Sequence, residues 1–427
     1  MKIALLSPLP PQQSGISDYV FHLLKGFNHH KTVTITLFSN AMIDNLLNCK
    51  VININTLADN NALDDYDLII YQLGNNIHYH HYMLALLKKY GGIVHLHDLV
   101  LHHMIAGMNY ENEQMTAGYF NIIENHYGKE NKAYIERKLT EGTSVWESNE
   151  VIDFPLFEEF VQYADSCIVH SQYALNRVKA VFPRLNVYCI EQLYDLKPLP
   201  KKIKASNCLR IGVFGGVDLQ KKVDTVIEVL ASIQALDQPF DFRLDVVGAV
   251  NETCQSIFSL PAELGLDDKV FIHGRIDEAY YHELLIQTDV IVALRVPTMG
   301  ETSAVVMQGL QLGIPVIVNN VGWYHELPDV VDKVSAVELK QGLQALLLKY
   351  LETDYLHLKT AAITAYALEH FNFESYIEHY QAILYHEYNG QLNKPLYPRL
   401  AKVFNELDII DDDILLRGCL KKIEAIF

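Results

Sequence analysis

The feature of this sequence that most constrains its fold is the repeated alternation of short aliphatic runs with helix-length amphipathic segments. The runs are rich in Val, Ile and Leu, as expected for strands that are buried on both faces of a sheet. Helices covering both faces of a parallel sheet produce this order along a chain. The pattern therefore predicts an α/β protein with parallel sheets in Rossmann-like domains.

Two series of predicted strands are separated by a segment that has no apolar periodicity. The first series is Ile3–Leu6, Val33–Phe38, Leu68–Tyr71, Ile93–Leu96, Cys167–His170 and Val187–Ile190. The second series is Leu209–Phe214, Phe242–Val247, Val270–Ile272, Val290–Leu294 and Val316–Val318, with helices near 222–236, 278–288 and 303–312. The segment between them contains Lys197-Pro198-Leu199-Pro200 and is predicted to be an exposed linker.

The two series predict two facing domains, because 427 residues exceed what one hydrophobic core usually organises. Residues 108–160 lack strand signals and are predicted to form a helical insertion in the first domain. The predicted boundaries are 1–190 for the N-terminal domain, 191–208 for the linker, 209–370 for the C-terminal domain and 371–427 for helices that return to the N-terminal domain.

Local signals predict where some helices begin and end. Ser17 or Asp18 is expected to cap the helix after the first strand, and Gly91 with Gly92 is expected to end the helix that starts near Tyr79. The acidic run Asp411-Asp412-Asp413 is predicted to cap a final helix.

The composition and net charge of the chain limit the classes of molecule that it is expected to bind. The 34 Lys and Arg against 52 Asp and Glu give a net charge of -18, which opposes binding to nucleic acid or to an anionic membrane. An anionic ligand therefore needs locally placed donors. The six cysteines show no CxxC spacing, which indicates neither a zinc site nor a disulfide framework and favours a cytoplasmic location.

Membrane insertion is not expected either. Pro8, Pro10 and Pro11 end the first apolar run before the core of a signal peptide could form. No run approaches the roughly 20 apolar residues of a spanning helix, so membrane contact is expected to be peripheral at most.

Four motifs follow predicted strands, where parallel sheets bind their ligands. The first is Ser14-Gly15-Ile16-Ser17-Asp18, in which Gly15 allows close approach of a ligand to the backbone or serves only the turn. The second is His95-Leu96-His97-Asp98. Its His97 is a candidate to contact a sugar hydroxyl or developing positive charge, and a core histidine bonded to a carbonyl is an equally good interpretation.

The third motif is Phe214-Gly215-Gly216, which precedes Lys221 and Lys222. A diphosphate could receive amides from the glycine turn and an ammonium from Lys221, although a tight turn with two exposed lysines explains the same residues.

The fourth and strongest motif is the loop 295–303, Arg295-Val296-Pro297-Thr298-Met299-Gly300-Glu301-Thr302-Ser303, which leads into a helix. An arginine, a carboxylate, hydroxyls and free helix amides together suit a diphosphate sugar. Capping by Thr302 or Ser303 alone is the less favoured explanation.

In this order, the motifs resemble the family-four retaining glycosyltransferases of the GT-B fold, which belong to the glycosyl transferases group 1. The resemblance also includes Val169-His170-Ser171 and Gly313-Ile314-Pro315-Val316, and it spans nearly the whole chain. It implies two facing Rossmann-like domains, a nucleotide-sugar site in the second domain, and a C-terminal helix that crosses back to the first.

The resemblance also implies roles for residues. His97, Asp98 and Glu301 are the predicted catalytic groups, with His97 beside the donor sugar. The predicted donor-binding residues are Gly15, Gly215, Gly216, Lys221, Arg275, Arg295, Thr298, Gly300, Thr302, Ser303 and Gln308.

Two positions depart from the family pattern. Gly216 stands where the family often has Arg, so charge neutralisation is assigned to Lys221 with Arg275 or Arg295. Gln308 and Gly300 stand where two glutamates are common, and a neutral amide at the ribose position should bind a diol less strongly than a carboxylate.

The implied reaction is front-side displacement with retained configuration, without metal or cofactor. A uridine diphosphate sugar is the first expectation for the donor, with guanosine diphosphate mannose as the alternative. The acceptor is an unidentified glycan, lipid-linked glycan or protein, in bacterial glycan or glycoconjugate synthesis.

Three other functions are also compatible with the sequence. The histidines between His78 and His103 suggest a metal-dependent hydrolase, although their spacing matches no HExxH signature. The same fold could serve a nucleotide-sugar epimerase or hydrolase. Gly216 and Gln308 also fit a non-catalytic nucleotide-sugar-binding partner.

Overall fold

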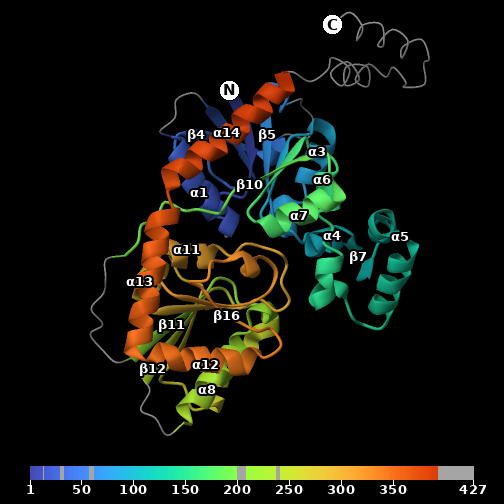
Figure 1. Ribbon diagram of the computed structural model, residues 1–427. Coiled ribbons are helices and arrows are strands. Elements are labelled where there is room, and N and C mark those ends of the chain that lie inside the picture. Colours follow the sequence, from blue (N-terminus) through green and yellow to red (C-terminus); the bar gives the residue numbers. More distant parts are fainter. Residues whose placement is uncertain (13, 29–32, 57–61, 200–207, 237–240, 393–427) are drawn as a thin grey trace, which may run out of the picture. The chain divides into compact units, whose positions relative to one another are not determined.

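The computed structural model describes residues 1–392 except 13, 29–32, 57–61, 200–207 and 237–240 (Figure 1). Part of the predicted linker and the acidic run Asp411-Asp412-Asp413 therefore lie outside the described residues. Two parallel sheets organise the rest, as the alternating pattern predicts, and each has its own hydrophobic core.

The first sheet has eight strands in the order β10-β9-β6-β5-β1-β2-β4-β3. Only the β3–β4 pairing in this sheet is antiparallel, as far as the described residues show. The strands are β1 Lys2–Leu6, β2 Thr34–Ser39, β3 Asn45–Leu46, β4 Cys49–Asn53, β5 Leu68–Leu73, β6 Ile93–Leu96, β9 Ser166–Val169 and β10 Asn186–Cys189. The associated helices are α1 Gly15–Phe27, η1 Ile54–Thr56, α2 Ile77–His80, α3 Met83–Tyr90, α4 His102–Met108 and α7 Gln172–Val181.

The predicted helical insertion is largely helical but begins with a small hairpin. It contains β7 Tyr110–Glu111, β8 Gln114–Met115, α5 Ala117–Thr140, η2 Val145–Glu147, η3 Asn149–Asp153 and α6 Glu158–Val161. The two-residue strands of the hairpin are too short to leave a periodic signal in the sequence.

The second sheet has six parallel strands in the order β13-β12-β11-β14-β15-β16. They are β11 Cys208–Phe214, β12 Asp241–Val247, β13 Val270–Gly274, β14 Val290–Ala293, β15 Val316–Asn319 and β16 Asp332–Val334. The remaining elements are η4 Leu219–Lys221, α8 Val223–Gln234, η5 Glu252–Phe258, α9 Leu260–Glu263, α10 Glu278–Gln287, α11 Ala304–Leu312, η6 Gly322–Glu326, α12 Leu339–Leu351, α13 Thr353–His370 and α14 Phe373–Leu392.

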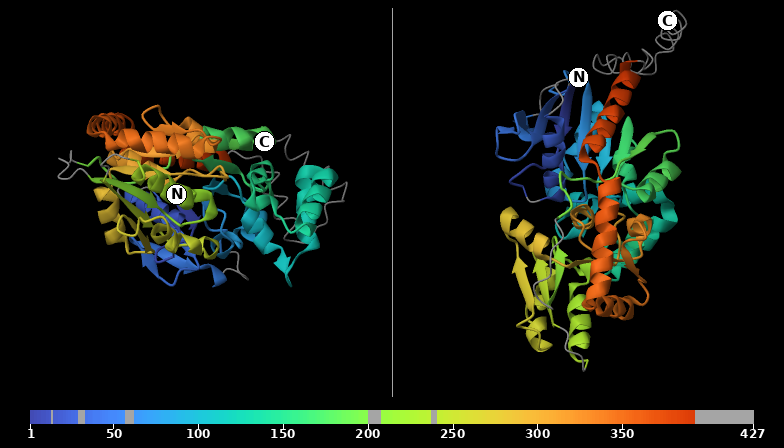
Figure 2. Two further views of the ribbon diagram at one scale, coloured as in Figure 1. Left: turned by 90° about the horizontal axis from the view of Figure 1, so that it is seen from below. Right: turned by 60° about the vertical axis from the view of Figure 1, so that its left-hand side comes forward.

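After the second sheet, the chain continues into α13 and α14. Helix α13 packs beside α11 and α12 of the second domain (Figure 2). The hydroxyl of Tyr376, in the first turn of α14, then hydrogen-bonds with the hydroxyl of Tyr19 in α1. No helix in the described residues has both the length and the apolar character needed to cross a membrane.

One predicted helix cap is wrong. The N-cap of α1 is Ser14, whose Oγ accepts the amide of Ile16 at 3.2 Å, whereas Ser17 and Asp18 lie inside the helix. The helix begins at Gly15, and its cap lies three residues before Ser17, the nearer of the two predicted caps. Gly91 does end α3, with a φ of 66° that favours glycine.

Candidate functional site

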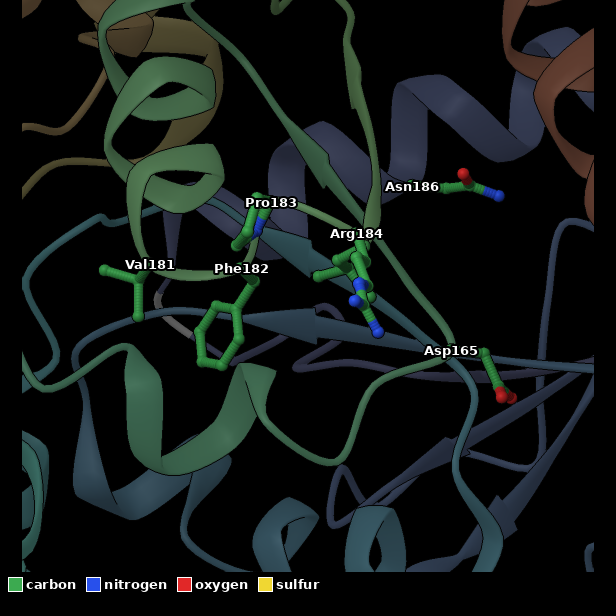
Figure 3. A pocket seen from close by; sticks show the side chains of 7 residues that line it. Asp165, Val181, Phe182, Pro183, Arg184 and Asn186 are labelled. Atoms are coloured by element: carbon green, nitrogen blue, oxygen red, sulfur yellow. The ribbon is translucent and has the colours of Figure 1, made fainter.

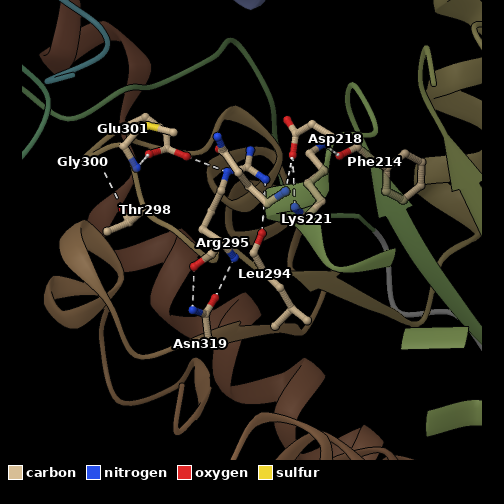
Figure 4. Close-up of polar contacts among 11 residues, drawn as sticks. Phe214, Asp218, Lys221, Leu294, Arg295, Thr298, Gly300, Glu301 and Asn319 are labelled. Carbon is tan, nitrogen blue, oxygen red and sulfur yellow. Dashed lines mark hydrogen bonds and ion pairs between the residues drawn. The ribbon is translucent and has the colours of Figure 1, made fainter. Parts of the chain in front are cut away.

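The loop 295–303 connects β14 to α11 at the carboxyl edge of the second sheet. Glu301 organises it: Oε1 accepts Nε of Arg295 at 2.6 Å, and Oε2 accepts the amide of Met299 at 2.7 Å (Figure 4). The hydroxyl of Thr298 accepts the amide of Gly300 at 3.0 Å. Both carboxylate oxygens of Glu301 thus fix the conformation of the loop.

Asn319 at the end of β15 fixes the base of the loop. Its Oδ1 accepts the amide of Arg295 at 2.7 Å, and its Nδ2 donates to the carbonyl of Arg295 at 2.8 Å (Figure 4). Because Asn319 is fully buried, the two bonds determine where the arginine leaves the sheet. The sequence prediction missed Asn319, although a polar residue ending a buried aliphatic strand was a usable signal.

Lys221 lies beside this loop, as predicted, but it is not exposed. Only 6% of the residue is accessible, and its Nζ donates to the carbonyl of Phe214 at 2.5 Å. The amide of Val296 donates to the carbonyl of Gln220 at 2.9 Å, which joins the loop to η4. The expectation of two exposed lysines is therefore wrong for Lys221, because the glycine turn folds its side chain inward.

Burial controls the charge of Lys221. Desolvation, and then the nearby guanidinium of Arg295, lowers its pKa to about 7, while the carboxylates of Asp218 and Glu301 act in the opposite direction. Arg295 stays charged at neutral pH. Two adjacent basic groups in a buried site favour a multiply charged anion between them.

The glycine turn at Gly215 and Gly216 leaves space for the side chain of Lys221. Gly215 has a φ of 87°, and a Cβ there would lie 2.6 Å from Nζ of Lys221. Gly216 is exposed next to it. Asp218 then caps η4, because its Oδ1 accepts the amides of Gln220 and Lys221 at 3.0 and 3.1 Å.

The N-terminus of α11 faces the same loop. Ser303 occupies the N-cap position without making a side-chain capping bond, which argues against the simple capping explanation for this residue. The hydroxyl of Thr302 instead donates to Oε1 of Gln192, after the first sheet's last strand, at 3.0 Å. The first-turn amides of α11 are left without a side-chain cap, which suits phosphate oxygens.

Asp98, which belongs to the first domain, lies near Arg295 and Glu301 of the loop 295–303. Its Oδ2 accepts the amide of Asn75 at 2.7 Å. Burial and the nearby Glu301 raise the pKa of Asp98 to about 6, against the effects of the Asn75 amide and of Arg295. The structure therefore places Asp98, Glu301 and Arg295 close enough for their charges to interact.

His97 lies deeper, in a cluster of buried histidines. Nε2 is 2.7 Å from Oε1 of Gln72, and Nδ1 is 3.0 Å from Nε2 of His170. The nitrogens that His95, His97 and His170 would offer a metal lie within 4.8 Å of one another. In this state both ring nitrogens of His97 contact protein groups, so its contact with a sugar stays a prediction.

Three further predicted residues, Gln308, Arg275 and Gly15, have other surroundings. Gln308 accepts the hydroxyl of Tyr281 with its Oε1 at 3.0 Å, a partner that the sequence did not reveal. Arg275 is exposed after β13, where its charge acts on the carboxyl of Asp18 rather than within the loop 295–303. Gly15 is exposed at the start of α1, and a Cβ added there would meet no atom of the described residues within 4 Å.

Two hollows lie in the described part of the chain. One of about 470 Å³ is lined by Asp165, Val181, Phe182, Pro183, Arg184, Leu185 and Asn186 (Figure 3). It lies where β9 and β10 begin, at the edge of the sheet opposite to the predicted site. Another of about 340 Å³ borders His170, Gln192 and Glu326.

Sequence comparison identifies the second domain. Residues 208–348 match the family model described as glycosyl transferases group 1. No curated protein sequence matches the chain significantly. The matched segment contains Lys221, the loop 295–303 and Gln308.

Solved structures extend the likeness to both domains. HepE (Alr3699) of Anabaena, solved in complex with UDP and glucose, has a TM-score of 0.60 and 15% identity, covering 90% of this chain and 99% of that one. Sucrose-phosphate synthase from Thermosynechococcus elongatus has a TM-score of 0.63 and 15% identity, covering 91% and 99%. WaaG, a glycosyltransferase involved in lipopolysaccharide biosynthesis, has a TM-score of 0.56 and 14% identity, covering 90% and 99%. Residues 208–348 are therefore a glycosyl transferases group 1 domain, and the chain as a whole has the two-domain α/β fold of these GT-B structures.

Proposed function

We propose that this protein transfers a sugar, with retention of anomeric configuration, from a nucleoside diphosphate sugar to a hydroxyl-bearing acceptor. The convergence of Lys221, Arg295 and the uncapped N-terminus of α11 carries the proposal. Each of these groups stabilises negative charge, which grows on the diphosphate as the glycosidic bond breaks. A uridine diphosphate sugar is the first donor to test, since HepE was solved with UDP-glucose.

The same residues suggest how the reaction proceeds. Lys221 and the amides of α11 would hold the diphosphate, and the acceptor hydroxyl would attack from the face that the leaving group vacates. A phosphate oxygen of the leaving group would take the acceptor's proton, so no side chain has to act as nucleophile. Glu301 would keep Arg295 and the loop in place rather than transfer a proton.

A three-part experiment tests this proposal. Nucleoside diphosphates of uridine, guanosine and adenosine are screened for an increase in Tm, which rises when a ligand binds the folded state. The stabilising nucleotide is then supplied as its sugar ester, with and without candidate acceptors, in EDTA. Proton NMR of the product reads the anomeric configuration.

We expect that the nucleoside diphosphate of one base raises the Tm of the protein. Sugar transfer should persist in EDTA, and the product should have the same anomeric configuration as the donor. Stabilisation without turnover would favour a non-catalytic binding partner. Epimerised or hydrolysed donor in the absence of acceptor would favour the other two reactions of this fold. An inverted anomer would contradict the proposed mechanism.

A further inference from the structure

Tyr324 carries a buried hydroxyl that lacks a hydrogen bond. Only 3% of the residue is accessible, and its Oη meets no partner in hydrogen-bond geometry within the described residues. A buried polar group without a partner costs free energy, because folding takes away the water that would otherwise bond to it. Such a group in a native protein requires an explanation. Tyr324 lies in none of the sequence motifs that indicated the donor site.

The fold places Tyr324 next to the loop 295–303. The residue belongs to η6, which follows β15 at the carboxyl edge of the second sheet. A Cβ added to Gly322, the first residue of η6, would lie 2.7 Å from Oγ1 of Thr298, so the backbone of η6 packs directly on the loop. The ring of Trp323 lies against that of Tyr324, with the centroids 5.5 Å apart. Backbone packing and the ring contact thus fix the position of the Tyr324 side chain.

Groups of the proposed donor site lie near this hydroxyl. Burial raises the pKa of Tyr324, the charge of Arg295 opposes this rise, the charge of Glu301 adds to it, and the side chain of Ser303 opposes it. Ser303 is the N-cap residue of α11 and makes no capping bond there. Its side chain is a polar neighbour of the Tyr324 hydroxyl, but the two do not meet in hydrogen-bond geometry. Because its pKa is raised, the hydroxyl keeps its proton at neutral pH and is available as a donor.

Three kinds of hydrogen-bond donor lie near one another in this part of the site. They are the Tyr324 hydroxyl, the Arg295 guanidinium and the first-turn amides of α11, which Ser303 does not cap. Glu301 is the nearby carboxylate, but its two oxygens already accept Nε of Arg295 and the amide of Met299. A guanidinium and a helix N-terminus both favour negative charge. The group that fits here is therefore an anionic oxygen, such as that of a phosphate.

We propose that Tyr324 is a further donor-binding residue, whose hydroxyl donates a hydrogen bond to a phosphate oxygen of the diphosphate at the N-terminus of α11. This inference rests on the proposed function, because it assigns another contact in the same donor site. The diphosphate supplies the acceptor that the hydroxyl otherwise lacks, and a bond to a charged acceptor is stronger than one between neutral groups. A tyrosine hydroxyl does not titrate near neutral pH, so its contribution to donor affinity is the same at about pH 6 and about pH 8.

Tyr324→Phe removes this hydroxyl and keeps the ring. Calorimetry with UDP-glucose, or with guanosine diphosphate mannose if the wild type selects guanosine, measures donor affinity at about pH 6 and about pH 8. The affinity should fall about tenfold at both pH values, because a hydrogen bond to a charged oxygen is lost. Loss of the Lys221 charge should instead matter most at the lower pH, where that side chain is protonated.

Tyr350→Phe is the matched control. Tyr350 in α12 is also buried, but its hydroxyl donates to Oδ2 of Asp332 at 2.6 Å. Loss of this partnered hydroxyl should lower the Tm of the ligand-free protein by about 2 °C or more and leave donor affinity unchanged. Tyr324→Phe should do the reverse. Its ligand-free Tm should not fall, because no bond is lost, whereas its donor affinity should.

A spectroscopic measurement locates the effect at the hydroxyl itself. The full-length protein is labelled with ¹³C at the tyrosine ring carbon that bears the hydroxyl, and the signal that disappears in Tyr324→Phe belongs to Tyr324. This signal should shift when uridine diphosphate is added, because the hydroxyl gains an acceptor. Uridine, which has no phosphate, should leave the signal in place. Guanosine diphosphate and guanosine replace this pair if the wild type selects guanosine.

Three results would overturn the inference while the donor site stands: wild-type donor affinity in Tyr324→Phe, a Tyr324 signal that the diphosphate does not move, or a ligand-free Tm that falls as in Tyr350→Phe. The last result would show that the hydroxyl has a structural partner. If no nucleoside diphosphate or nucleotide sugar bound the wild type, the proposed function and this inference would both fail. Diphosphate binding without sugar transfer would count against the proposed function alone, and weaker binding by Tyr324→Phe would still support this inference.

Discussion

Lys221 and Arg295 place two basic groups in a buried site that also contains the carboxylates of Asp218 and Glu301. Holding like charges together costs free energy, and an anion that binds between them removes part of that cost. Burial, and then the repulsion from Arg295, lowers the pKa of Lys221 to about 7, so its charge can change near neutral pH. Diphosphate binding should therefore be coupled to protonation of one identified side chain.

This coupling predicts a pH dependence. A bound diphosphate favours the ammonium form, so donor affinity should be highest below pH 7 and fall about tenfold between pH 6 and pH 8 as free Lys221 loses its proton. Calorimetry with the nucleotide sugar measures it, because the esterified diphosphate does not titrate in this range. Lys221→Met should bind at least about tenfold more weakly at pH 6 and lose the slope.

Lys222→Met is the matched control, since it removes the adjacent lysine, which is half-buried and follows the same turn. Lys222→Met should keep both the wild-type affinity for the donor and the wild-type dependence of that affinity on pH. If donor affinity in Lys221→Met still fell with rising pH as in the wild type, the titrating group would be a residue other than Lys221. Removal of the buried ammonium should also leave Lys221→Met at least as stable as the wild type at pH 6, where that charge costs most.

Gln308 gives a second prediction for a single residue. Its Oε1 is engaged by the Tyr281 hydroxyl, so the amide offers the ligand donors rather than a strong acceptor. Gln308→Glu keeps the bond from Tyr281 and supplies a second, charged acceptor. Affinity for the ribonucleoside diphosphate should rise by about 1 kcal/mol or more, and 2′,3′-dideoxyribose should abolish the gain. Equal gains with both sugars would place Gln308 away from the ribose.

At the scale of secondary structure, the loop 295–303 connects β14 to α11 and is held in place by Asn319 of β15. Their aliphatic runs revealed the three elements in the sequence, because buried parallel strands need such runs. The bonds between Asn319 and Arg295 could not be predicted, because they depend on β15 lying next to β14 in the sheet. The short strands β3, β4 and β16 were missed for a related reason: their partly exposed residues leave no continuous apolar signal.

The same limit applies to side chains. The glycine turn and the following lysine were visible in the sequence, but the inward direction of Lys221 depends on the carbonyl of Phe214 that it meets. The histidines were visible too, whereas the bond between His97 and His170 joins residues 73 positions apart. Sequence patterns therefore indicated the candidate site residues along the chain, whereas tertiary contacts determine the charge and the partners of these side chains.

Asn319→Ala tests the support of the loop by β15. Loss of two buried hydrogen bonds to Arg295 should cost about 2 to 4 kcal/mol in the free energy of unfolding, and diphosphate affinity should fall with it. Urea unfolding and calorimetry measure the two effects. The neighbouring exposed Asn320→Ala should change neither by more than about 0.5 kcal/mol. A stable Asn319→Ala with normal affinity would show that the loop does not need this clamp.

At the scale of the whole molecule, the loop 295–303 also contacts the first domain. The amide of Val100 donates to the carbonyl of Met299 at 3.1 Å, and Gly300 lies against Leu99 and Tyr173. These contacts bring Asp98 toward Arg295 and Glu301. Domain approach would thus assemble the predicted catalytic groups from both domains.

Gly300→Ala tests this arrangement. Gly300 has a φ of 66°, and an added Cβ would lie 2.9 Å from Leu99, so the methyl group should push the two domains apart. Turnover should fall about tenfold or more, while nucleotide affinity changes less. Gly265→Ala is the control, because its φ is 69° and an added Cβ there has no neighbour within 4 Å in the described part of the chain. Equal losses in both variants would attribute the effect to backbone strain alone.

A crystal structure of the protein with its stabilising nucleoside diphosphate tests the proposed donor site. We predict that the diphosphate lies between Nζ of Lys221 and the first-turn amides of α11, with the Lys221 ammonium turned from the Phe214 carbonyl toward a phosphate oxygen. A diphosphate bound elsewhere, or one that leaves Lys221 bonded only to Phe214, would contradict it.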